Sequence, residues 1–289
     1  MEIKNSSVKV LENSDLDIGK GEQNNTLRFD ILNKWLETET RGRYTVLKNF
    51  VSGDITPDPL KTITMTTQST YQYLYHIEEQ CKRWEGPISV GVYAPGPEYA
   101  LNVHLIYYLR ICKHECIKSN ISWHLVYDTE SDPKTSDSYP FCHIESMNFE
   151  CNQSFDDIIK EYKTSINSNH SLIYPINVIR NVARLSARTK YVMAIDIELY
   201  PSVGLVSQFL QLVEREKAGQ VSTSRQVYVL PVFELKTGAT PPTNKTQLLS
   251  LFKSGMGRVW VGYGSGMSCF YIMFNTFSLN LKERQTFFT

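Results

Sequence analysis

Short β-branched segments alternate with amphipathic helical segments in the first half of the chain, and this alternation most constrains the fold. Strand-like sequence occurs at 61–66 (KTITMT), 88–93 (ISVGVY) and 121–127 (ISWHLVY), and helical patterns fill the intervals at 70–84 and 98–112. Strand–helix–strand order predicts an α/β protein, with a mostly parallel sheet and helices on both faces. In open sheets of this class, ligands bind in the crevice at the carboxyl ends of the strands.

Two carboxylates follow a further strand-like segment, in the stretch YVMAIDIELYPS (191–202). The apolar run 191–195 reads as a buried strand. Because strand side chains alternate, we expect Asp196 and Glu198 to point the same way. Paired carboxylates repel unless a cation lies between them, and a hard ion such as Mn²⁺ or Mg²⁺ takes oxygen ligands and leaves positions for phosphates. The alternative, a solvated strand end that carries Asp-x-Glu by chance, stays open.

The helix predicted at 174–189 (YPINVIRNVARLSART) directly precedes the acidic pair. Apolar residues repeat at helical spacing on one of its faces. Arginines recur every four residues on another face, at Arg180, Arg184 and Arg188. An arginine-rich helix next to two carboxylates favours a site for an anionic ligand held through a metal ion.

Composition excludes some classes of protein and leaves the cellular compartment open. The formal net charge is zero, so the charge balance implies no nucleic acid as partner. We expect no membrane-spanning helix, because no run of about 18 apolar residues occurs. The polar start MEIKNSSVKVLENSD does not resemble a signal peptide.

Cysteines and glycosylation sequons point in the other direction. The cysteines contain no C-x-x-C pair, which makes zinc improbable; they could be core residues or be oxidised in a secretory lumen. Cys112 and Cys116 are expected on one face of a helix. Six Asn-x-Ser/Thr sequons are typical of a glycosylated, lumenal protein. They begin at Asn5, Asn24, Asn120, Asn152, Asn169 and Asn244.

Three blocks of sequence resemble the family-49 glycosyltransferases. The blocks are TMTTQSTYQYLYHIEEQCKRWEGPISVGVYAP (64–95), YPINVIRNVARLSARTKYVMAIDIELYPSVGL (174–205) and VYVLPVFELKTGATPPTNKTQLLSLFKSG (227–255). This family holds the β-1,4-glucuronyltransferase group and is similar to the second catalytic domain of the LARGE xylosyl- and glucuronyltransferases. The resemblance covers roughly residues 43–256, with the blocks in order.

The resemblance implies a GT-A-type fold that binds a nucleotide-diphospho-sugar. Asp196 and Glu198 would occupy the family's Asp-x-Asp positions and bind Mn²⁺, or Mg²⁺, together with the diphosphate of a UDP-sugar. The second residue is a glutamate here, which adds one methylene to the metal ligand. Thr66, Thr67 and Gln68 end the first strand of the domain, where the uridine would lie.

Further site residues follow from the same resemblance. Asn177, Arg180 and Asn181 would face the nucleotide-sugar. Arg180 suits a phosphate or a glucuronate carboxylate because guanidinium pairs bidentately with both; a structural salt bridge is the alternative. Glu234 would lie near the acceptor as a candidate general base for direct displacement at the anomeric carbon.

The activity implied is a metal-dependent, inverting transfer of glucuronate from UDP-glucuronate to a xylose-ended or related glycan on a glycoprotein, as in matriglycan-type protein O-glycosylation. The implied location is the lumenal side of the Golgi membrane, although this chain shows no signal-anchor helix. A non-catalytic member acting as a partner or glycan-binding remnant is the alternative. An α/β phosphate hydrolase is weaker, because no phosphate-cradling loop is visible.

The domain organisation expected from these observations has three parts. Residues 1–42 would be a flexible stem or arm, with a short amphipathic helix at 27–40. Residues 43–256 would form the glycosyltransferase domain. Residues 257–289 do not resemble the family and would be a divergent tail. The family's distal part, which supplies a metal-binding histidine and much of the acceptor pocket, is therefore expected to be missing.

Overall fold

The structure is a computed structural model, and the residues it describes belong to one compact unit that starts at Glu37. The described residues are 37–131, 133, 149–163, 173–219, 230–259 and 269–272. None of the helices in these segments is long and apolar enough to cross a bilayer.

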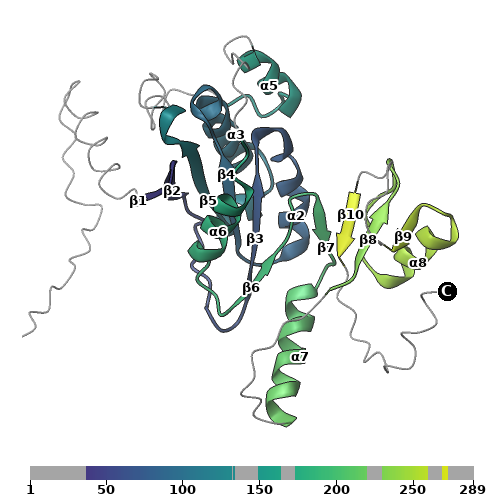
Figure 1. Cartoon of the computed structure of the whole chain (residues 1–289). Helices are drawn as coiled ribbons and strands as arrows, with labels where there is room; N and C mark the ends of the chain where they lie inside the picture. The colour runs from purple at the N-terminus through teal and green to yellow at the C-terminus, as the bar shows by residue number, and fades with distance from the viewer. Residues whose placement is uncertain are drawn as a thin grey trace, which may run out of the picture. The chain divides into compact units, whose positions relative to one another are not determined.

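The larger sheet has six strands in the order β1-β2-β5-β4-β3-β6 (Figure 1). The strands β5, β4, β3 and β6 run parallel, whereas β2 pairs antiparallel with both β1 and β5. The strand bounds are β1 (Glu37–Arg41), β2 (Tyr44–Val51), β3 (Ile63–Ser69), β4 (Ile88–Tyr93), β5 (Ile121–Asp128) and β6 (Tyr191–Ala194). The predicted α/β class with a mostly parallel sheet is thus confirmed.

Helices cover both faces of the sheet, as the alternating pattern predicts. Figure 1 shows α6 in front of the strands and α2 and α3 behind them. Every residue of β3 and β4 is buried, which requires cover on both faces. The helix bounds are α2 (His76–Trp84), α3 (Tyr99–Cys112), α4 (Glu115–Asn120), α5 (Phe155–Lys163), α6 (Ile176–Ser186), α7 (Leu205–Gly219) and α8 (Lys245–Lys253).

The strand β6 differs from the prediction of a buried central strand. It ends at Ala194, it pairs only with β3 among the described strands, and it therefore forms an edge of the sheet. Its burial alternates, and the Val192 side chain is 39% exposed. An apolar run predicts extended structure, but it does not predict how many other strands pair with that strand.

The amino-terminal boundary also differs from the prediction. The strand β1 lies inside the segment expected to be a flexible arm, and it occupies 37–40 of the expected amphipathic helix. It forms a hairpin with β2 across Gly42, whose φ of +61° suits glycine. The rest of the predicted arm lies outside the described residues.

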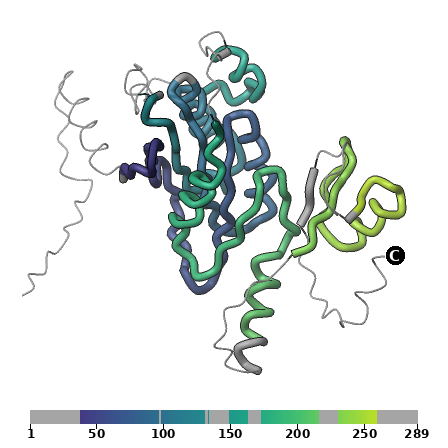
Figure 2. Tube along the Cα trace, in the orientation of Figure 1, coloured from purple at the N-terminus to yellow at the C-terminus, as the bar shows by residue number. Residues whose placement is uncertain are grey.

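A smaller four-stranded sheet has the order β7-β10-β8-β9. Its strands are β7 (Leu199–Pro201), β8 (Val232–Leu235), β9 (Gly257–Val259) and β10 (Cys269–Ile272). Both β9 and β10 pair with β8, so parts of the predicted divergent tail belong to the same sheet as the family-like segment before it. Figure 2 follows the chain from α6 through β6 to the turn that enters β7.

Two disulfides join α2 to α4 and the end of α3 to the segment before α5, which answers a question that the sequence leaves open. One joins Cys81 to Cys116 and the other joins Cys112 to Cys151. The expectation that Cys112 and Cys116 share a helix is wrong, because α3 ends at Cys112 and Cys116 lies in α4. Of the remaining cysteines, Cys142 lies outside the described residues.

Candidate functional site

The strand order places a crevice between β3 and β6. From β3 the chain proceeds to β4 and β5 on one side and later adds β6 on the other side, so the connections diverge between β3 and β6. Open α/β sheets bind ligands at this switch point, at the carboxyl ends of the strands. A cavity of about 420 Å³ lies there. Its lining residues are Thr66, Thr67, Gln68, Asn177, Arg180, Asn181, Arg184, Ala194, Ile195, Asp196 and Leu199.

One wall of the cavity is a single face of α6. Asn177, Arg180, Asn181 and Arg184 are spaced by three or four residues, which places them side by side on the helix. The opposite face of α6 carries buried Ile179, Val182 and Ala183 against the sheet. The helix is therefore fixed to the core by its apolar side and presents amides and guanidinium groups to the cavity.

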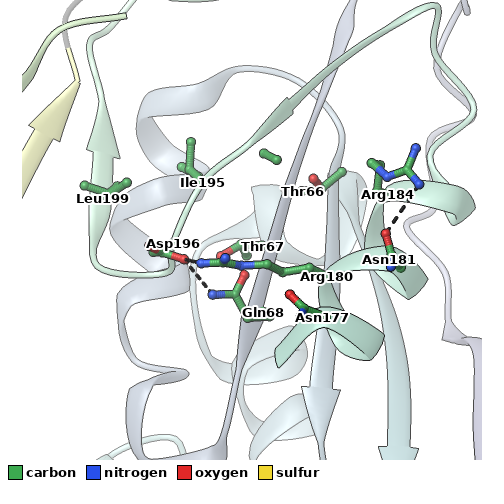
Figure 3. A pocket seen from close by; sticks show the side chains of 11 residues that line it. Thr66, Thr67, Gln68, Asn177, Arg180, Asn181, Arg184, Ile195, Asp196 and Leu199 are labelled. Atoms are coloured by element: carbon green, nitrogen blue, oxygen red, sulfur yellow. Dashed lines mark hydrogen bonds and ion pairs between the residues drawn. The ribbon is translucent and has the colours of Figure 1, made fainter. Parts of the chain in front are cut away.

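The second wall is the end of β6 and the turn that follows it. Asp196 occupies this turn, and its backbone carbonyl accepts a hydrogen bond from the Leu199 amide at 3.0 Å. Gln68 Nε2 donates to Asp196 Oδ1 at 2.7 Å, and Arg180 forms an ion pair with the same oxygen (Figure 3). The Asp196 side chain remains 39% exposed, so a ligand in the cavity can reach it.

Glu198 does not line the cavity with Asp196. The prediction that the two side chains point the same way is wrong, because β6 ends at Ala194 and both acids lie in the connection to β7, where strand alternation does not apply. They still interact. Burial raises the pKa of the Glu198 carboxyl above its ordinary value, and the nearby Asp196 carboxylate adds to the rise. This repulsion is what a cation would relieve.

Glu234 lies apart from the cavity residues. It occupies β8 of the smaller sheet, is 2% exposed, and its Oε2 accepts a hydrogen bond from Arg258 Nε at 2.5 Å. Among the described residues, therefore, the candidate general base and the candidate nucleotide-sugar residues do not share one pocket.

The oxygen atoms around Asp196 are of the type that a hard divalent cation takes as ligands. Thr67 Oγ1 and Gln68 Oε1 are buried and have no hydrogen-bond partner among the described residues, and both residues line the cavity. The described residues contain no group of three His, Cys, Asp or Glu that could hold a metal ion. Asp196 and Glu198, of which only Asp196 lines the cavity, are the two carboxylates that would hold Mn²⁺ or Mg²⁺; substrate phosphates and waters would complete the coordination, as is common for such ions.

Four lining residues are not among the site residues that the sequence predicts: Arg184, Ala194, Ile195 and Leu199. Arg184 could have been predicted from the sequence, because it follows Arg180 by one helical turn and so lies on the same face of the helix. The other three are apolar, and the path of the chain from the end of β6 to the start of β7 brings them into the cavity.

The sheet order, the covered faces and this cavity define an α/β protein with a polar crevice at its switch point, formed by an arginine-bearing helix and an acidic turn. A family model described as "Glycosyl-transferase for dystroglycan" matches residues 62–260. The chain belongs to this glycosyltransferase family, family 49.

Individual relatives agree with the family match. Beta-1,4-glucuronyltransferase 1 of Danio rerio is 31% identical over 228 residues, which cover 74% of this chain and 51% of the relative. The enzyme of the same name from Bos taurus is 25% identical over 236 residues, covering 80% and 54%. Xylosyl- and glucuronyltransferase LARGE2s of Danio rerio is 23% identical over 194 residues, covering 67% and 20%. The chain thus spans about half the length of the glucuronyltransferases it matches.

Proposed function

We propose that this chain is a metal-dependent glycosyltransferase domain that binds a UDP-sugar in the cavity between β3, β6 and α6. The proposed donor is UDP-glucuronate, and the proposed acceptor is a xylose-ended or related glycan on a glycoprotein, as in matriglycan-type protein O-glycosylation. The observation that carries the proposal is the position of Asp196, held at the switch point by Gln68 and Arg180.

In the proposed complex, each wall of the cavity has a separate task. Asp196 and Glu198 would hold Mn²⁺ or Mg²⁺, which supplies charge neutralisation for the departing diphosphate. Arg180 would exchange its ion pair with Asp196 for a bidentate contact with a phosphate or with the glucuronate carboxylate. The exchange is inexpensive, because both partners are more than a third exposed and such pairs contribute little to stability.

The remaining lining groups would orient the donor. Thr67 Oγ1 and Gln68 Oε1 at the end of β3 offer unpartnered oxygen atoms to the nucleoside or to the ion's water ligands. Asn177 and Asn181 offer amide donors and acceptors on the α6 wall. The acceptor hydroxyl would displace UDP at the anomeric carbon, and its proton would pass to a general base. Glu234 is the candidate from the resemblance, but it does not line this cavity in the structure.

Calorimetric titration of UDP with and without Mn²⁺ tests this proposal. We expect wild-type affinity to depend on Mn²⁺, and Asp196→Ala to lose that dependence because one of the two carboxylate ligands is gone. Asp157→Ala is a matched control, since Asp157 is an exposed carboxylate on α5 that pairs with Lys160. UDP affinity unchanged by Asp196→Ala, with and without Mn²⁺, would refute the assignment.

The donor sugar is a separate experiment. Mn²⁺-dependent hydrolysis or transfer would be compared for UDP-glucuronate, UDP-xylose and UDP-N-acetylglucosamine. We expect UDP-glucuronate to be preferred, and equal rates with the neutral sugars would overturn the proposed donor.

The proposed compartment is the Golgi lumen, on the lumenal side of the membrane. Two disulfides support an oxidising environment. Two sequon asparagines, Asn152 and Asn244, are exposed and therefore accessible to a glycan. Mobility shifts on glycosidase treatment of the protein expressed in secretory cells would test this, and an unglycosylated product would count against it.

A non-catalytic role is the second candidate function, as a partner or a glycan-binding remnant. The observation that favours it is the position of Glu234, which is buried, bound to Arg258 and outside the cavity. Transfer assays with the purified 289-residue chain separate the two candidates. Full transfer activity would exclude the non-catalytic role, whereas metal-dependent UDP binding without transfer would favour it.

A further inference from the structure

Gln80, in α2, is fully buried and directs its amide nitrogen at the acidic turn. Its Nε2 donates to the carbonyl oxygens of Ile197 at 2.9 Å and Leu199 at 3.0 Å, with a longer contact of 3.4 Å to that of Asp196. Carbonyl oxygens only accept hydrogen bonds, so the NH₂ group and not the oxygen of the amide must face them. The two amide hydrogens thus serve mainly the Ile197 and Leu199 carbonyls, whereas the Asp196 carbonyl also accepts from the Leu199 amide.

The turn depends on such a partner because it lies between two sheets. The β3–β6 ladder stops at Ala194, and β7 begins at Leu199. Buried carbonyls that a ladder does not satisfy need a side chain or water, and an unpaired one is costly. The apolar anchors of the turn, Ile195 and Ile197, are buried but cannot supply that partner.

We propose that Gln80 is a positioning residue that sets the direction of the Asp196 and Glu198 carboxylates toward the cation. The inference rests on the proposed function, since it assumes that these two acids hold the metal. Gln80 does not touch the cavity; it fixes the backbone from which both ligands project. Outer-shell partners that orient metal ligands typically account for about 10- to 100-fold in metal affinity.

A second contact of α2 offers a matched control. One helical turn before Gln80, His76 Nδ1 pairs with the Tyr200 hydroxyl at 2.5 Å. This contact joins the same helix to β7, just beyond the turn, and it is also buried. Removing the His76–Tyr200 contact should destabilise the packing of α2 against β7, as removing Gln80 would, but it leaves the carbonyls of the turn bound to Gln80.

The experiment compares Gln80→Met, Tyr200→Phe, Asp196→Ala and wild type. Free Mn²⁺ is measured by electron paramagnetic resonance during titration, and Tm is measured on the same samples. Met keeps the length of Gln80 but removes both amide hydrogens. We expect Gln80→Met to weaken Mn²⁺ binding by about 10- to 100-fold. Tyr200→Phe should lower Tm and leave Mn²⁺ affinity within about twofold, because the turn retains its partner.

The outcomes separate the inference from the proposed function. Unchanged Mn²⁺ affinity in Asp196→Ala overturns the metal site itself. If Asp196→Ala loses Mn²⁺ affinity and Gln80→Met does not, only the role of Gln80 is overturned. Equal losses of Mn²⁺ affinity in Gln80→Met and Tyr200→Phe would overturn that role as well. If Gln80→Met does not fold, Gln80→Asn keeps the amide but shortens its reach, and it should give a smaller loss in the same direction.

Discussion

Gly91 controls how closely α6, with its cavity-facing side chains, can approach the sheet. It lies in β4 beneath the helix, where a Cβ atom would meet Ile179 Cγ2 at 2.5 Å and the Ile179 carbonyl oxygen at 2.8 Å. Ordinary van der Waals contact begins near 3.4 Å. The side-chain methyl could rotate away, but the carbonyl is part of the helix backbone. Gly91→Ala must therefore push α6 outward at this point.

The expected cost is that of overpacking a well-packed core, about 1–3 kcal/mol of unfolding free energy. Urea denaturation followed by tryptophan fluorescence measures it, and the m-value should not change. UDP affinity in the presence of Mn²⁺ should fall by roughly an order of magnitude, because a shift of α6 displaces Arg180 and the two asparagines on its wall.

Gly238→Ala is the control for this prediction. No described residue would crowd a Cβ at Gly238, but its φ is +85°, so alanine there costs about 1–2 kcal/mol of backbone strain. It lies between β8 and α8, away from the cavity lining, and UDP affinity should stay unchanged. The reasoning is wrong if Gly91→Ala changes the unfolding free energy by less than about 0.5 kcal/mol.

Two further predictions concern stability. Burial lowers the pKa of His124 to about 3. Between that value and the ordinary histidine pKa of 6.5, the histidine is protonated in the unfolded state but neutral in the folded state. The contribution of neutral His124 to the free energy of unfolding is therefore fully present above pH 6.5 and falls by about 1.4 kcal/mol per pH unit toward pH 3. In urea titrations, the unfolding free energy of His124→Gln should depend less on pH than that of the wild type. Parallel pH curves for the two proteins would contradict this. The Cys112–Cys151 disulfide closes a loop with a sequence separation of 39, so replacing both cysteines by serine should lower the unfolding free energy by about 4 kcal/mol. Equal denaturation midpoints would contradict that expectation.

The local elements around the site were predictable from the sequence. The strands β3, β4 and β5 and the helices α2, α3 and α6 lie close to their expected positions, because period-two and period-3.6 patterns and helix breakers report each element separately. The arginine face of α6 could be read in the same way, since residues four apart on a helix are neighbours wherever the helix packs.

The position of β6 shows where such patterns stop being informative. An apolar run predicts a strand, but whether the strand is central or at an edge depends on which neighbours pair with it. The same limit applies to the smaller sheet, where β7, β8, β9 and β10 come from four separate segments of the chain. The acidic turn is a third case, because a strand that ends at Ala194 cannot impose alternation on Asp196 and Glu198.

The sequence by itself determined which side chains could hold a metal ion and an anionic ligand, and it determined the secondary structure that carries most of them. Only the tertiary structure decided that Gln68 and Asp196, 128 residues apart, share a hydrogen bond, and that Gln80 supports the turn from behind. It also separated Glu234 from the cavity. The physical reason is that local patterns depend on the chain's own period, whereas a cavity depends on strand order and on long-range contacts that no single segment encodes.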